Sequence, residues 1–207
     1  MTKTVRSLEN LEEPFNFHYP SGATIVTSHA RGRDNAMAVA WHVAVSRNPA
    51  YYAICISSNR FTHSLISETG EFVVNFMPKE RNDLVATVAG CSGRDVDKFR
   101  SFKIAASQGS RVKAQVLEDA FAAFECRVVG HHPYGDHDIF VGAVLAVQFE
   151  AAAFKQDGRL LDLERVKPIL YMGNDRYATT GDGSVHIERE ALVKAAMKGT
   201  AGLRGPG

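Results

Sequence analysis

Hydrophobic residues along this chain gather in short runs whose composition fits β-strands. The runs are rich in Val, Ile, Thr and aromatic residues, and Gly, Asn or Pro bounds them. They predict strands at residues 23–29, 35–45, 50–57, 71–77, 120–130 and 137–150. We expect the last two strands to form a central hairpin, joined by the polar segment HHPYGDH.

Helical spacing of hydrophobic residues is confined to short segments. Residues 61–70 predict a helix with Thr62 as a candidate N-cap and Gly70 as its left-handed end. In that helix Leu65 and Ile66 are spaced to face inward.

Three more segments predict short helices or helical turns. Residues 79–90 repeat the helical pattern, and residues 92–102 form a polar turn that leaves room for another helical turn. Residues 188–198 predict a terminal helix, and we expect the Gly-rich tail after it to be flexible.

Many strands with only short helices inserted favour a closed or partly closed antiparallel barrel. The chain has no glycine fingerprint between a strand and a helix and no Walker-type phosphate loop, which argues against a Rossmann or P-loop site. A chain of 207 residues that is 45% hydrophobic can close one sizeable core. We therefore predict one mostly β domain over 1–207, with its core at about 20–180 and a C-terminal helix and flexible tail after 187.

The charge balance offers no overall attraction to nucleic acid or anionic lipid, because 24 basic residues face 23 acidic ones. The first residues, MTKTVRSLENLEEP, lack the apolar centre of a secretory signal. No uninterrupted apolar run approaches the roughly 20 residues that a membrane helix needs. We expect a cytoplasmic protein with neither a nucleic acid nor a membrane as partner.

A metal site is not expected from the sequence. The three cysteines are far apart and suggest neither a disulfide framework nor a zinc knuckle. The densest histidine patch, HHPYGDHD, lies in the expected hairpin turn, where neighbouring residues seldom converge on one ion without a third element. Its candidate ligands are His131, His132, Asp136, His137 and Asp138.

Several ordered motifs together resemble the flavin reductase-like family of FMN-binding split-barrel proteins. They are residues 24–76, SGRDVDKF at 92–99 and GDHDIFVGAVLAV at 135–147. The resemblance implies a six-stranded Greek-key barrel with short peripheral helices, a homodimer, and FMN, or less often FAD, in a groove near the subunit interface. It covers residues 20 to about 180, which is nearly the whole chain.

The stretch DNAMAVAW suits a flavin ring, which needs a flat apolar wall and polar groups along its edge. We expect the turn from Arg31 to Asn35 to present main-chain groups and the Asn35 amide to the ring. Small side chains would let the backbone come close, and Trp41 would either close the wall or anchor the core. The small residues are Ala36, Met37 and Ala38.

The stretch ISSNRFTH suits a phosphate, because it combines hydroxyls, a guanidinium and the start of a helix. A capped surface helix with a solvated arginine is the alternative. Lys98 is a second cation of the kind that the family brings to the phosphate, unless it forms only a surface ion pair with Asp95 and Asp97. The candidates for the phosphate and ribityl chain are Ser57, Arg60, Thr62 and His63.

His137 matches the family histidine that lies near the flavin face where the nicotinamide docks. Its alternative is a turn histidine hydrogen-bonded to the backbone, and the two interpretations are evenly balanced. The resemblance thus implies an NAD(P)H-dependent flavin reductase with NADH or NADPH as co-substrate and a monooxygenase or another redox protein as acceptor. A tightly FMN-bound electron carrier and a flavin-binding sensor or storage module are the other function classes.

Overall fold

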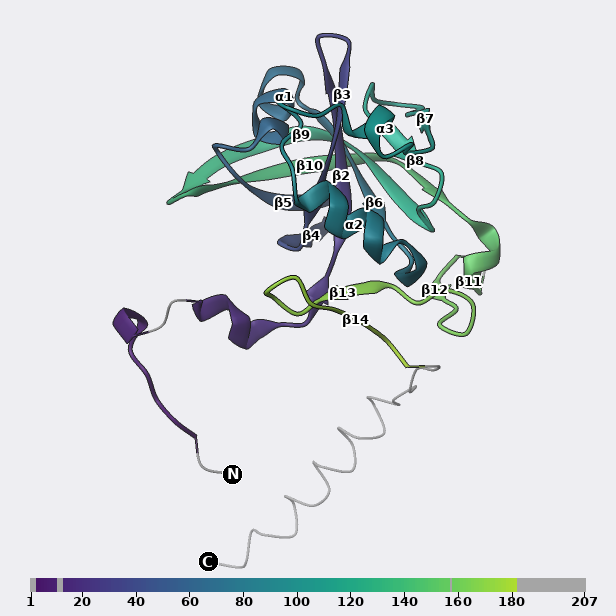
Figure 1. The fold of residues 1–207 in the computed structure, drawn as a ribbon. Coiled ribbons are helices and arrows are strands. Elements are labelled where there is room, and N and C mark those ends of the chain that lie inside the picture. Colours follow the sequence, from purple (N-terminus) through teal and green to yellow (C-terminus); the bar gives the residue numbers. More distant parts are fainter. Residues whose placement is uncertain (1–2, 11–12, 157, 182–207) are drawn as a thin grey trace, which may run out of the picture.

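The main body of the protein is a seven-stranded antiparallel sheet with the strand order β3-β2-β6-β9-β10-β5-β4 (Figure 1). This computed structural model describes residues 3–10, 13–156 and 158–181, so the predicted helix at 188–198 and the tail lie outside the described residues. The strands are β2 (Thr24–Ala30), β3 (Arg33–Val39), β4 (His42–Arg47), β5 (Ala50–Ser57), β6 (Glu71–Phe76), β9 (Ala122–Tyr134) and β10 (His137–Phe149).

The sheet curls into a partly closed barrel, because its two edge strands, β3 and β4, follow each other in the chain. Only Ala40 and Trp41 separate them, so the two edges must come close together. The backbone N–H of Cys55 donates to the carbonyl of Trp41 at 2.9 Å, which ties this connection to β5. The prediction of one strand over 35–45 is therefore wrong, and the break explains why the main sheet has seven strands where the resemblance implied six.

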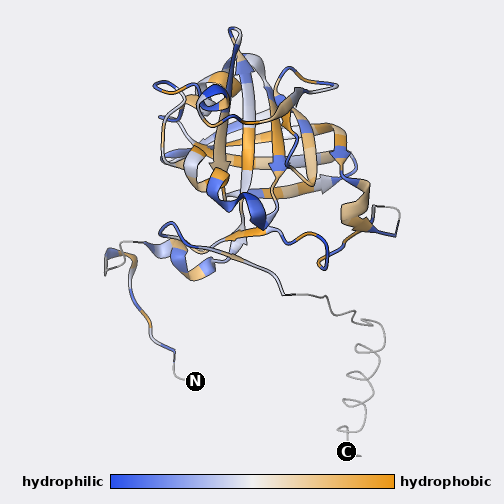
Figure 2. Ribbon diagram, turned by 45° about the vertical axis from the view of Figure 1, so that its right-hand side comes forward, coloured by the Kyte–Doolittle hydropathy of each residue, from blue (hydrophilic) through white to orange (hydrophobic). Residues whose placement is uncertain are grey.

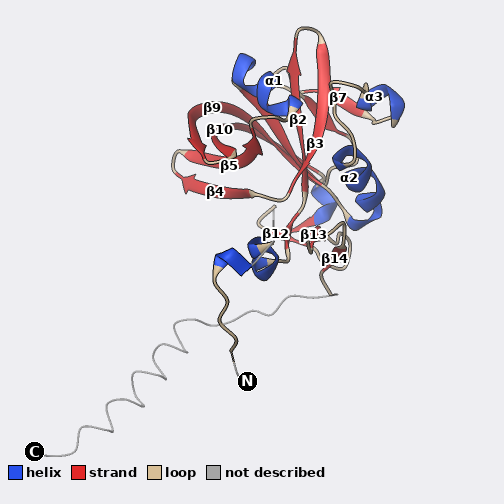
Figure 3. Ribbon diagram, turned by 60° about the vertical axis from the view of Figure 1, so that its left-hand side comes forward, coloured by secondary structure: helices blue, strands red, loops and turns tan. Residues whose placement is uncertain are grey.

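Short helices lie around the outside of the strands (Figure 3). Figure 2 shows hydrophobic positions running along the strands, while hydrophilic ones concentrate in the loops and short helices. The helices are α1 (Phe61–Thr69), α2 (Asn82–Ala89) and α3 (Lys98–Ser101), with 3-10 turns η1 (Leu8–Asn10), η2 (Pro14–His18), η3 (Lys79–Arg81) and η4 (Ala151–Ala153).

Small sheets complete the architecture. Among the described residues β1 (Ser21–Gly22) pairs with β13 (Ile169–Tyr171), which pairs with β14 (Tyr177–Thr179). This sheet lies below the barrel, beside the N-terminal segment (Figure 1). The other pairs are β7 (Ala106–Gln108) with β8 (Gln115–Leu117), and β11 (Phe154–Lys155) with β12 (Leu160–Leu161).

Buried apolar side chains form one core inside the barrel and another under α2. The barrel core brings together Ile54, Ile56, Phe72 and Phe140, each at most 1% exposed. The second core includes Ile25, Met77, Val85, Val88 and Leu117. The helical pattern predicted within 79–90 is confirmed in α2, which buries Val85 and Val88 in this second core and lies against β3.

Two local predictions need correction. The N-cap of α1 is Arg60, and Thr62 lies inside the first turn, although Leu65 and Ile66 are buried and Gly70 has a φ of 67° as expected. The hairpin between β9 and β10 turns on Gly135 and Asp136 alone. His131 and His132 therefore belong to β9 and do not lie in a turn.

Candidate functional site

A pocket of about 540 Å³ opens between β3, the start of α1 and the segment that leads into α3. Four sequence segments meet there, and each contributes polar groups. The lining residues are Asn35, Met37, Ala38, Asn59, Arg60, Phe61, Thr62, Val88, Ala89, Cys91, Ser92, Gly93, Arg94, Asp95 and Lys98. Six of the residues predicted for a cofactor are among them: Asn35, Met37, Ala38, Arg60, Thr62 and Lys98.

Asn35 presents an unpaired acceptor in the wall of this pocket. Its side chain is 2% exposed, and its Nδ2–H donates to Thr62 Oγ1 at 2.8 Å. Its Oδ1 has no hydrogen-bond partner among the described residues. A buried acceptor without a partner costs about 1–3 kcal/mol, so a ligand donor at this point is favoured.

Gly93 makes room for the Asn35 amide. A Cβ at position 93 would overlap Asn35 Oδ1 and would lie 2.9 Å from Phe61 Cδ1. Asn35 cannot swing aside easily, because it is buried and held by Thr62. Gly93 was not among the residues predicted for the site. The sequence marks it only as the glycine of the motif SGRDVDKF.

Lys98 is buried in the pocket wall and makes no ion pair with Asp95, Asp97 or any other described residue. It is 3% exposed, and its Nζ donates to the carbonyl oxygens of Ala36 at 2.8 Å and Val88 at 2.6 Å. Burial lowers the pKa of Lys98, and the nearby Arg60 guanidinium lowers it further. Two of the three ammonium donors are used by these carbonyls, so the third is left for a group in the pocket.

The start of α1 adds further donors. The exposed Arg60 guanidinium has no hydrogen bond or ion pair within the described part of the chain, and as N-cap it gives the helix no side-chain cap. The first amide groups of α1 therefore lack an intrahelical or capping partner on the side of the pocket. Arg94 donates to the carbonyl of Asn59 at 2.6 Å, and its guanidinium lies 5.8 Å from the Phe61 ring.

A second hollow continues the pocket beyond Ala38 and Ala89, which line both. It has a volume of about 180 Å³ and reaches the rings of Tyr171 and Tyr177. Burial raises the pKa of Tyr177. A ligand with a charged end and a flat apolar end would find matching surroundings along these two hollows.

Trp41 and His137 lie together, outside the lining of the pocket. Their ring centroids are 4.8 Å apart, and the Trp41 Nε1–H donates to Tyr19 Oη at 3.4 Å. His137 opens β10, pairs with Ser57 of β5, and donates from Nδ1 to Asp136 at 2.9 Å. Its partner is thus a carboxylate and not the backbone. Ser57 itself lies two residues before Asn59, which lines the pocket.

The remaining predicted residues lie elsewhere in the structure. Ala36 is fully buried and contributes only its carbonyl, which accepts from Lys98. His63 points to Asp138 of β10, with its Nε2–H donating at 2.8 Å. The Arg31 to Asp34 turn, which was expected to face the ligand, is the tip of the β2–β3 hairpin and does not line the pocket. Of residues 31–35, Asn35 alone lines the pocket.

Comparison with known proteins gives matches over most of the chain. Residues 17–181 match the family model of the flavin reductase like domain. The NADH-dependent FMN reductase AsuE2 of Streptomyces nodosus subsp. asukaensis is 31% identical over 128 residues, which are 60% of this chain and 66% of AsuE2. An uncharacterized protein of Aeropyrum pernix is 30% identical over 159 residues, which are 76% of this chain. The chain spans 59% of the length of that relative.

Solved structures share the fold. An FMN-binding protein from Thermus thermophilus superposes with a TM-score of 0.81 and 30% identity, covering 90% of this chain and 100% of its own. A flavoredoxin from Methanosarcina acetivorans gives a TM-score of 0.80 at 25% identity, over 93% of this chain and 100% of its own. The barrel is therefore a split barrel of the kind found in FMN-binding proteins. No helix among the described residues is long and apolar enough to cross a membrane.

Proposed function

Because this chain belongs to the flavin reductase like family, we propose that it is an NAD(P)H-dependent flavin reductase. The reaction is the transfer of a hydride from a nicotinamide to FMN, with FAD as the other possible flavin. The similarity to AsuE2, which is named an NADH-dependent FMN reductase, supports this activity. The acceptor of the reduced flavin is proposed to be a monooxygenase or another redox protein.

The unpaired Asn35 carbonyl oxygen beside Gly93 is the observation that carries the proposal. A flavin ring has an N–H donor on its edge, which is the group that this buried acceptor lacks. FMN also ends in a phosphate, and Arg60, Lys98 and the uncapped start of α1 supply donors of matching charge. The residues present thus match the two kinds of polar group that the cofactor carries.

Each residue has a defined task in this proposal. Arg60 and Lys98 hold the phosphate, and Thr62 fixes the orientation of the Asn35 amide. The backbone of β3 from Ala36 to Ala38 forms the wall for the ring. Ser57 and His63 were expected at the phosphate or ribityl chain, but neither lines the pocket, so we assign them no contact to the cofactor.

A bound flavin supplies the hydride acceptor. The protein orients the two reactants and excludes water, which can account for a large share of the rate because alignment of reacting groups replaces a bimolecular encounter. Trp41 and His137 are proposed to hold the nicotinamide, since their rings form one aromatic surface beside Ser57 and β5. His137 need not move a proton during this transfer.

A tightly FMN-bound electron carrier is the second candidate, because the fold matches that of a flavoredoxin at a TM-score of 0.80. The pocket would serve a carrier equally well. The difference is that no nicotinamide has to dock beside Trp41 and His137.

Turnover measurements separate the two functions. The purified protein is inspected for yellow colour, and the loss of NADH and of NADPH is followed with and without added FMN. Oxidation of either nucleotide in proportion to free FMN supports the reductase. A firmly bound yellow flavin without oxidation of either nucleotide would contradict the reductase and support the electron carrier.

A further inference from the structure

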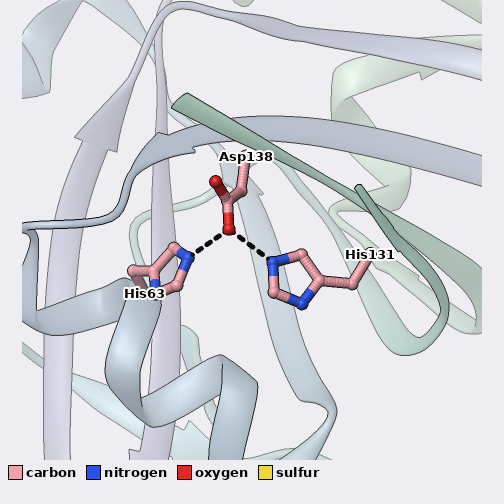
Figure 4. A group of neighbouring side chains, drawn as sticks. All are labelled: His63, His131 and Asp138. Atoms are coloured by element: carbon pink, nitrogen blue, oxygen red, sulfur yellow. Dashed lines mark hydrogen bonds and ion pairs between the residues drawn. The ribbon is translucent and has the colours of Figure 1, made fainter. Parts of the chain in front are cut away.

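Three side chains from three different elements converge beside the β9–β10 hairpin (Figure 4). They are His63 in the first turn of α1, His131 in β9 and Asp138 in β10. The Nε2–H groups of the two imidazoles donate to the same oxygen, Asp138 Oδ2, at 2.8 and 2.6 Å. The three donor atoms all lie within 4.8 Å of one another.

The strand register explains how the hairpin provides two of these groups. His131 of β9 stands directly opposite Phe140 of β10. Asp138 precedes Phe140 by two residues, so its side chain lies on the same face of the sheet, diagonal to His131. The convergence cannot be seen in the local sequence, because the third group, His63, comes from a helix 68 residues earlier than His131. The fold supplies, in His63, the third element that the histidine patch lacks in the sequence.

The two imidazoles are held in place by their surroundings. The buried Phe140 ring stacks on His131 with centroids 4.2 Å apart and the planes at 14°, and it meets His63 edge-on at 5.1 Å. Ser67, one turn further along α1, lies 3.5 Å from the other ring nitrogen of His63. A partner on the second nitrogen is what fixes the tautomer of a metal-binding histidine.

The three side chains are buried to different extents, and the cluster is open to solvent at His131. The side chains of His63 and Asp138 are 14% and 13% exposed, whereas that of His131 is 38% exposed. Three protein ligands with one open position are the arrangement of zinc sites that keep a water or an exogenous ligand. Two imidazole nitrogens and a carboxylate oxygen also match the ligand preference of zinc.

We propose that His63, His131 and Asp138 form a binding site for one Zn²⁺ ion. Each imidazole moves its single proton from Nε2 to Nδ1, so the ion occupies the place between the two Nε2 atoms and Asp138 Oδ2 and no proton is lost. The imidazole protons then lie on Nδ1, where that of His63 donates to Ser67 Oγ. The metal ties the start of α1, which lines the candidate pocket, to the β9–β10 hairpin, and so stabilises the folded protein.

Metal titration of the full chain tests this site. The protein is first treated with a chelator and then titrated with Co²⁺, followed by its visible absorption, and with Zn²⁺ by calorimetry. We expect one equivalent of either ion to bind and the melting temperature to rise with Zn²⁺. His131→Ala and Asp138→Asn should each weaken binding by at least about tenfold, because each removes one of three ligands.

His132→Ala is the matched control, since neighbouring residues of a strand point to opposite faces. It should bind the ions like the parent protein. The proposal fails if the parent binds no stoichiometric ion, or if His131→Ala and the parent bind it equally well. If Asp138→Asn does not fold, the comparison of His131→Ala with His132→Ala decides alone.

Discussion

At the scale of single residues, chemistry and motif together pointed to side chains that the fold brings to one pocket. Asn35, Arg60, Thr62 and Lys98 were all expected at a cofactor from their types and their order in the chain, and all four line one pocket. The burial of Lys98 could not be foreseen, because it depends on the packing of α3 against β3. Nothing local in the sequence marks which glycine faces Asn35, so Gly93 was missed.

Replacement of Arg60 by Ala should weaken FMN binding by about tenfold or more and leave riboflavin binding almost unchanged. The reason is that only FMN carries the phosphate that this guanidinium would meet. Fluorescence titration with both ligands measures the effect. Arg31→Ala is the control, because Arg31 pairs with Glu68 at the hairpin tip and should change neither affinity. An equal loss of affinity for FMN and riboflavin would show that the phosphate binds elsewhere.

Replacement of His137 by Ala should slow the reduction of bound flavin by NAD(P)H about tenfold, equivalent to roughly 1.4 kcal/mol of barrier. His137 is proposed to orient the nicotinamide beside Trp41, so FMN affinity and the melting temperature should stay nearly constant. Stopped-flow absorbance measures the rate, with His132→Ala as control. A parent-like rate would remove His137 from the site, and loss of folding would assign it a structural role.

At the scale of elements, composition and periodicity placed most strands correctly. The run 50–57 coincides with β5, and the helix at 61–70 coincides with α1 within one residue. The run 35–45 failed because its hydrophobic pattern continues across Ala40 and Trp41, where the chain passes from one edge of the sheet to the other. The strand breaks there because the barrel closes at this point, and closure depends on strands far away in the sequence.

His42 links β4 to two other elements and should make stability fall in mild acid. It contacts the hydroxyl of Tyr52 in β5 at 2.6 Å and donates to the carbonyl of Gly22 in β1 at 3.0 Å. Burial lowers the pKa of His42, although the Gly22 carbonyl partly opposes the shift. The unfolded chain therefore binds a proton more readily, so this contribution is full above about pH 6.5 and is lost as the pH falls through the folded pKa.

Comparison of the parent with His42→Gln isolates this contribution. The difference between their free energies of unfolding should shrink from about pH 7.5 to about pH 5, because the variant lacks the titrating group. Urea unfolding at both pH values measures it. A difference that stays constant or grows in acid would contradict the assignment.

At the scale of the whole molecule, the resemblance predicted the barrel and its short peripheral helices. The resemblance also implied a homodimer, and the apolar strands at 71–76 and 139–149 are the candidate contact surfaces for it. The first of these is covered within the protein, because β6 is buried at four consecutive positions. Only the second strand retains exposed apolar side chains: Val147 and Phe149 are each 51% exposed.

We predict a homodimer that uses this part of β10. Val147 and Phe149 border an apolar hollow of about 360 Å³ that Phe121 and Phe154 also line. Sedimentation equilibrium at micromolar concentration should give twice 22.6 kDa. Val147→Asp should shift the protein to monomer, while Val5→Asp, at a 94% exposed position, should not. A parent protein that sediments only as a monomer would contradict the prediction.

The rate of NADH and NADPH oxidation in the presence of FMN, compared between Gly93→Ala and Gly90→Ala, tests the central claim most directly. A methyl group at 93 would overlap the Asn35 oxygen, whereas at 90 it would make ordinary contacts of 3.6 and 3.7 Å. The parent and Gly90→Ala should oxidise one of the nucleotides, and Gly93→Ala should lose about tenfold or more of that rate while remaining folded. A parent that oxidises neither nucleotide, or a Gly93→Ala variant as active as the parent, would contradict a flavin reductase that works from this pocket.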